Sequence, residues 1–121
     1  MQLAAVQALA QGPEWFSELN AGYAERKVAA GRIFDLLGVD YDHDSSGLFL
    51  WGHVRGDNAF LTGDGSASLG ERLSDRLLYD AGVFITPGFI FGENGRDYVR
   101  ISLCAKTEVL AEAENRINIC K

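Results

Sequence analysis

An arginine in the middle of an apolar strand constrains this chain more than any other feature. Residues 98–103, Tyr-Val-Arg-Ile-Ser-Leu, alternate in the manner of a strand whose two faces differ. One face carries Val99, Ile101 and Leu103, and the other carries Tyr98, Arg100 and Ser102. A charged group among apolar neighbours is costly unless it meets an anion, and the planar fork of arginine suits a carboxylate bound through two hydrogen bonds. Arg100 therefore either faces water on a half-exposed sheet or forms the centre of an anion site.

The segment before this strand reads as a second strand followed by a turn. Residues 83–86 are rich in β-branched and aromatic side chains, so we expect a strand there that stops at Pro87-Gly88. An apolar loop follows from Phe89 to Phe91. Turn-forming residues then precede the arginine strand, namely Gly92, Asn94 and Gly95.

These motifs together resemble a known family. The run 82–88, Gly-Val-Phe-Ile-Thr-Pro-Gly, then Phe91-Gly92, Gly95 and the run 98–102 resemble the C-terminal small domain of class I and II, fold-type I, pyridoxal-phosphate-dependent aminotransferases. In that family the arginine of this strand binds the α-carboxylate of the substrate. The resemblance implies the same role for Arg100.

Residues 48–54 predict a third strand that needs cover on both faces. Leu48, Leu50 and Val54 are expected on one face, and Phe49, Trp51 and His53 on the other. The resemblance extends here, because Gly47, Phe49 and Trp51 match the family's Gly-x-Phe-x-Trp pattern, whose aromatic face turns toward the active site. It implies that Trp51 and Phe49 line the substrate cleft. His53 is interpreted as a strand residue, since no carboxylate nearby in the sequence would orient it as a catalyst.

The first third of the chain predicts two packed amphipathic helices. An alanine-rich helix over residues 1–11 ends near Gly12, and Pro13 opens a longer helix over 14–37 that Gly38 ends. The longer helix carries two adjacent apolar stripes: Trp15, Leu19, Ala29, Ile33 and Leu36, beside Phe16, Tyr23, Ala30, Phe34 and Leu37. Residues 1–37 resemble the family's segment that links the large domain to the small one.

The remaining segments predict short connections and two further helices. Residues 39–41 are a candidate strand, and the Asp42-His43-Asp44 run is interpreted as a turn, not a metal site. The loop over 55–65 lacks the lysine of a phosphate-binding loop. Ser68 and Glu71 form a capping box that opens a helix ending at Ala81 before Gly82, with an inner stripe of Leu69, Leu73 and Leu77. The last helix is expected over 106–118, with Leu110, Ala113 and Ile117 inward.

The net charge and the length of the apolar runs disfavour some classes of partner. The 121 residues carry a net charge of -6, which disfavours nucleic acid. No apolar run is long enough to span a membrane, and the first residues do not predict a signal peptide. Cys104 and Cys120 lack metal-type spacing and are expected to be free thiols in the cytoplasm.

The predicted fold is α+β, with a small, mostly antiparallel sheet of three or four strands and helices packed on one face. We expect the face of Tyr98, Arg100, Phe49 and Trp51 to form a cleft against a second domain. The resemblance implies that residues 1–121 are the family's small domain, and we expect no nucleic acid or membrane partner.

The resemblance also implies what a longer enzyme would supply. It would transfer an amino group between an amino acid and a 2-keto acid, use pyridoxal 5'-phosphate and act as a homodimer. Lys27, Lys106 and Lys121 lie outside any active-site context, so this chain is expected neither to bind the cofactor nor to turn over substrate alone. One alternative is a ligand-sensing module of an aminotransferase-like transcription regulator, and another is a small domain with a solvated arginine.

Overall fold

The computed structural model describes residues 2–61 and 65–120, which form three antiparallel strand pairings and a layer of helices. The helices are α1 (Gln2–Leu9), α2 (Pro13–Leu37), α3 (Leu69–Ala81) and α4 (Thr107–Ile119), and the strands are β1 (Asp40–Tyr41), β2 (Phe49–His53), β3 (Thr86–Pro87) and β4 (Tyr98–Ser102). Two short 3-10 turns, η1 (Gly88–Phe91) and η2 (Glu93–Gly95), connect β3 to β4. The sheet order is β1-β2-β4-β3, with β4 central and β3 at the edge. This confirms the predicted α+β class.

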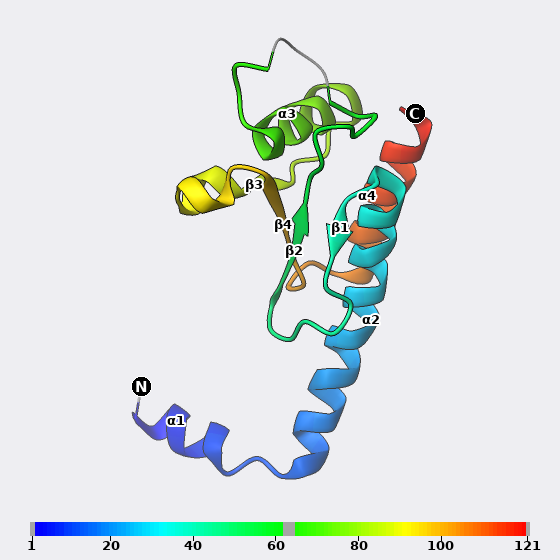
Figure 1. Cartoon of the computed structure of the whole chain (residues 1–121). Coiled ribbons are helices and arrows are strands. Elements are labelled where there is room, and N and C mark those ends of the chain that lie inside the picture. The colour runs from blue at the N-terminus through cyan, green and yellow to red at the C-terminus, as the bar shows by residue number, and fades with distance from the viewer. Residues whose placement is uncertain (1, 62–64, 121) are drawn as a thin grey trace.

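The core lies between the sheet and the last three helices. Leu50, Val99 and Ile101 point from β2 and β4 toward these helices and are almost fully buried. The second half of α2, together with α3 and α4, covers them, and α4 runs alongside α2 (Figure 1). The buried helical side chains are Ala29, Ala30, Ile33, Phe34, Leu37, Leu73, Leu77, Leu110 and Ile117. The helices therefore leave the opposite face of the sheet uncovered, as predicted.

The sequence signals at the helix ends are confirmed. Gly38 and Gly82 end α2 and α3 with φ angles of 64° and 63°, in the left-handed region that glycine adopts without strain. The Ser68 hydroxyl oxygen accepts a hydrogen bond from the Glu71 N–H at 3.4 Å, so the first half of the capping box is present. Pro13 occupies the first turn of α2, where its missing N–H costs nothing.

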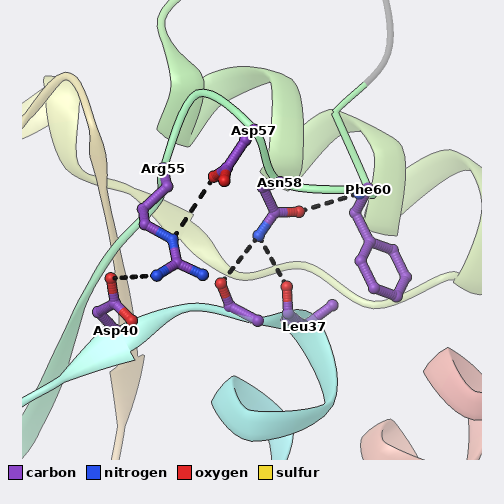
Figure 2. A network of polar contacts seen from close by, with 7 residues as sticks. Leu37, Asp40, Arg55, Asp57, Asn58 and Phe60 are labelled. Atoms are coloured by element: carbon purple, nitrogen blue, oxygen red, sulfur yellow. Dashed lines mark hydrogen bonds and ion pairs between the residues drawn. The ribbon is translucent and has the colours of Figure 1, made fainter.

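One asparagine ties the end of α2 to the loop that follows β2. Asn58 Nδ2 donates to the carbonyl oxygens of Leu37 and Gly38 at 2.7 and 3.1 Å, and its Oδ1 accepts from the Phe60 N–H at 2.9 Å (Figure 2). Arg55 bridges Asp40 and Asp57 beside it. The two Asn58 bonds satisfy the carbonyls of Leu37, the last residue of α2, and of its C-cap Gly38, which have no partner within the helix.

The expected strand over residues 83–86 is wrong in length. Only Thr86 and Pro87 pair with β4, and an edge strand tolerates a proline because its outer side has no neighbouring strand that needs the missing N–H. The preceding residues are held by α3 instead: the Val83 N–H donates to Leu77, and the Ser74 hydroxyl donates to the Ile85 carbonyl at 2.6 Å. Because those groups bond to α3, they cannot also pair with β4.

The predicted apolar loop over Phe89 to Phe91 is a 3-10 turn, η1. Leu48 also departs from prediction, since it precedes β2 and is exposed. The buried face of β2 therefore consists of Leu50 and Gly52 and continues to Val54.

The prediction of two packed N-terminal helices is also wrong. Helix α1 buries no residue and stands apart from the sheet (Figure 1). In α2 the apolar stripes are buried only from Ala29 onward. Trp15, Phe16 and Leu19 remain exposed because the first half of the helix projects beyond the core. Arg26 lies between the exposed and the buried part of α2, and its Nη1 donates to the Leu103 carbonyl at 3.2 Å. Across the described chain, no helix combines the length and apolar character needed to cross a membrane.

Candidate functional site

Arg100 lies at the centre of the sheet face that the helices leave uncovered. Its Cα pairs with Trp51 on one side and Thr86 on the other. Its neighbours in β4, Val99 and Ile101, point into the core. Alternation then directs the arginine side chain to the opposite face, where it is half-buried. The predicted orientation of β4 is confirmed.

Three aromatic rings surround the guanidinium. Arg100 Cζ lies 4.0 Å from the ring centroid of Phe49, 4.2 Å from that of Phe91 and 5.8 Å from that of Trp51. The Trp51 and Phe91 rings also meet edge to face, with centroids 5.4 Å apart. Cation–π attraction stabilises such an arrangement by about 0.5–1 kcal/mol where it is exposed and more where water is excluded. The charge thus sits in an aromatic, half-buried setting.

The guanidinium has no counter-ion among the residues that the structure describes. Five other arginines pair with carboxylates there: Arg32, Arg55, Arg76, Arg96 and Arg116. Arg100 does not, and its Nε is buried without a hydrogen-bond partner. An unsatisfied buried donor costs about 1–3 kcal/mol, more when it is charged. A carboxylate that accepts from the fork would relieve this cost and balance the charge.

The other polar residues on this sheet face are less suited to bind or activate a substrate. His53 pairs with Tyr98 across the strands, and their rings lie 5.1 Å apart. The Ser102 hydroxyl accepts from the Cys104 N–H at 3.2 Å, so it is used in the turn after β4. Over residues 2–61 and 65–120, no cluster of three potential metal ligands is present, the Asp42-His43-Asp44 turn included. In that turn, Asp42 Oδ1 instead accepts from the Asp44 N–H.

Tyr41, whose pKa is raised, lies on β1 and not beside Arg100. Burial raises the pKa of Tyr41, and the charge and hydrogen bond of the neighbouring Asp35 carboxylate raise it further. A Cβ on Gly31 would approach the Tyr41 ring at 3.2 Å, so this glycine makes room for the phenol. The arrangement belongs to the packing of β1 on α2.

A groove of about 430 Å³ runs between residues 82–86 and α4. Arg100 and Ser102 border it, but Phe49, Trp51 and Phe91 do not. Its apolar walls include Ile33, Ile85 and Leu110. The groove therefore reaches Arg100 but not the three aromatic rings around its guanidinium.

Sequence reasoning predicted Arg100, Phe49 and Trp51 as site residues, and the structure brings these three together. It does not predict the contact of Phe91 with the guanidinium, because the apolar loop and the family motif that include Phe91 assign it no role at Arg100. The sequence feature that could have indicated this contact is an aromatic residue directly before Gly92, in the connection between two paired strands. Spacing alone could not specify which side of the sheet that turn would cover.

The described lysines do not provide a site for a pyridoxal cofactor. Lys27 Nζ donates to the Ser45 carbonyl, and Lys106 is an exposed residue at the start of α4. Neither belongs to the strands that carry the aromatic cluster. Lys121 lies outside the described residues, and among those that the structure describes no lysine lies in these strands to fit the group.

Apolar side chains on the uncovered face and its turn remain exposed. They include Phe49, Trp51, Phe89, Ile90 and Phe91, with exposed fractions from 38% to 55%. Contiguous apolar surface of this kind is typical of an interface. We expect the isolated chain to self-associate, with an average mass in analytical ultracentrifugation that rises with concentration.

A matched pair of variants tests this expectation. Ile90→Ser removes an apolar side chain from the patch and should weaken self-association, whereas Val28→Ser, at a similarly exposed position on α2, should not. A chain that stays monomeric at millimolar concentration would contradict the interpretation of the patch as an interface.

Known proteins provide an independent comparison. No family model matches the chain. It is 30% identical over 118 residues to the LL-diaminopimelate aminotransferase of Maridesulfovibrio salexigens, with 98% of this chain and 28% of that protein covered. It is 35% identical over 118 residues to transaminase BacF of Bacillus subtilis, with 97% and 27% covered.

The solved structure of apo-BacF from Bacillus subtilis has the same fold, with a TM-score of 0.75 and 32% identity over 98% of this chain. The chain covers 29% of that structure. It thus spans less than a third of the length of the relatives it matches.

Proposed function

Because this chain is a homologue of aminotransferases and corresponds to the C-terminal small domain of the fold-type I, pyridoxal-phosphate-dependent enzymes, we propose that it is the substrate-binding part of such an enzyme. The complete enzyme would transfer an amino group between an amino acid and a 2-keto acid. Residues 1–121 would form its small domain, and residues 1–37 would lead to a large domain outside this chain.

We propose that Arg100 binds the α-carboxylate of both substrates. The observation that carries this role is a half-buried guanidinium surrounded by aromatic rings, with an unpartnered Nε and no counter-ion on the described residues. A carboxylate accepted by two N–H groups of one fork is fixed in direction as well as position. That orientation would hold the substrate Cα–H bond toward groups of the large domain.

Phe49 and Trp51 would line the cleft beside this carboxylate. Both rings contact Arg100 and are 38% and 39% exposed, so they are available to a substrate or to a second domain. Apolar walls exclude water and strengthen the ion pair, because charges attract more strongly where the dielectric constant is low.

The remaining elements of the enzyme would come from outside this chain. Pyridoxal 5'-phosphate would bind to the large domain and supply the electron sink for amino transfer. The exposed apolar face supports a homodimer or an interface with that domain. A cytoplasmic location agrees with two cysteines that form no disulfide.

The test of this function is a transamination assay on the longer protein that carries this chain. We expect the purified protein to bind pyridoxal 5'-phosphate and to convert an amino acid and a 2-keto acid, supplied from a panel, into the exchanged pair. A protein that binds the cofactor but exchanges no amino group with any member of the panel would contradict the proposal.

A further inference from the structure

We infer that Phe91 is a positioning residue that holds the Arg100 guanidinium in the orientation that receives a carboxylate. The inference rests on the proposed function, since it assigns a role within the same site. The Phe91 ring centroid lies 4.2 Å from Arg100 Cζ, about as close as the 4.0 Å of Phe49. Phe91 makes no hydrogen bond of its own to a carboxylate, so it would act through the arginine.

The two rings are held in different ways. Phe49 belongs to β2, and its Cα pairs with Ser102 of β4, so the sheet register sets its position. Phe91 is the last residue of η1 and pairs with no strand. Its place over the guanidinium therefore depends on the double turn formed by η1 and η2.

That double turn is closed by a contact between two glycines. A Cβ on Gly88 would overlap the Gly95 carbonyl oxygen, and a Cβ on Gly95 would overlap that of Gly88. Gly92 lies between them with a φ angle of 128°, a conformation that other residues rarely adopt. The N–H groups of Gly92 and Gly95 donate to Phe89 and Gly92 at 3.0 and 2.9 Å. The backbone is thus tightly folded directly before and after Phe91.

A ring over Cζ leaves the hydrogen-bonding edge of the fork available. Cation–π attraction uses the flat face of the guanidinium, whereas its N–H groups point outward in the plane. The contact removes side-chain rotamers that the carboxylate would otherwise have to exclude on binding. Without Phe91, the arginine would keep its charge but lose part of this orientation.

The experiment uses the 121-residue chain below the concentration of self-association and acetate as the probe. Nitrogen-15 relaxation gives the order parameter of the Arg100 Nε–H bond, and its chemical shift reports acetate binding at constant ionic strength with chloride exchanged for acetate. Arg100→Gln assigns the resonance. We expect Phe91→Ala to lower the order parameter and raise the apparent Kd for acetate roughly three- to tenfold.

Three further variants separate positioning from general packing. Phe91→Tyr keeps a ring and should behave like the parent chain, whereas Phe91→Leu keeps apolar bulk without a π face and should behave like Phe91→Ala. Phe89→Ala removes a ring of the same turn for which no contact with the guanidinium is seen, and should change neither quantity. If Phe91→Ala does not fold, Phe91→Leu carries the comparison.

The outcomes distinguish this inference from the proposed function. If acetate shifts the Arg100 resonance equally in the parent chain and Phe91→Leu, with the same order parameter, the positioning role is overturned and the carboxylate site stands. If acetate does not shift that resonance in the parent chain, the carboxylate site itself is overturned, and the role of Phe91 with it.

Discussion

Replacing Arg100 with lysine in the longer enzyme is expected to lower kcat/KM for an amino acid roughly ten- to a hundredfold. Lysine keeps the positive charge but presents a single ammonium group in place of a planar fork. The carboxylate would then be held by one charge-assisted hydrogen bond instead of two, and each contributes about 1.5–3 kcal/mol. The ammonium would also lack the planar guanidinium, whose Cζ lies 4.0 and 4.2 Å from the ring centroids of Phe49 and Phe91.

Steady-state kinetics with an amino acid and with its decarboxylated amine provide the measurement. The amine has no α-carboxylate, so its kcat/KM should fall much less. The cofactor absorbance should persist, because the cofactor contacts are expected in the large domain. Arg96→Lys is a matched control, since Arg96 is an exposed arginine paired with Glu93 at 3.5 Å. Equal losses for amino acid and amine, or no loss for either, would mean that Arg100 has a structural role.

Gly70→Ala is expected to destabilise the chain by about 3 kcal/mol or more. Gly70 lies in the first turn of α3 against the start of β4, and its N–H donates to the Arg96 carbonyl at 2.9 Å. A Cβ there would overlap the Tyr98 carbonyl oxygen and lie 3.0 Å from that of Arg96. Both obstacles are backbone atoms, so relief requires α3 to move away from the strand that carries Arg100.

Gly22→Ala is the matched control, because Gly22 also lies in a helix and a methyl group added there would meet no atom outside its own helix within 4 Å. There the same substitution should stabilise the chain by up to about 1 kcal/mol, since alanine has the higher helix propensity. Urea unfolding followed by circular dichroism measures both changes in the free energy of unfolding. If both variants shift that free energy in the same direction, close contact at Gly70 is not what distinguishes the two sites.

Features of the fold that depend on neighbouring residues could be predicted from the amino-acid sequence. Alternation along β4 placed Arg100 opposite Val99 and Ile101, because successive strand side chains point to opposite faces. Gly38 and Gly82 marked the ends of α2 and α3, since few other residues adopt the left-handed conformation found there. The motifs around Arg100 indicated the similarity to aminotransferases that the comparison with known proteins also found.

Contacts between segments that are distant in the sequence could not be predicted, because several partners were compatible with each segment. Val83 and Ile85 have the composition of a strand, yet α3 takes their backbone groups, so the sheet edge is short. Trp15 and Leu19 continue a helical stripe, but they lie beyond the sheet that would bury them. Phe91 reaches Arg100 because the Gly88 and Gly95 backbones meet across a double turn. Such outcomes depend on competition between distant groups for the same contact, and local periodicity carries no information about which one prevails.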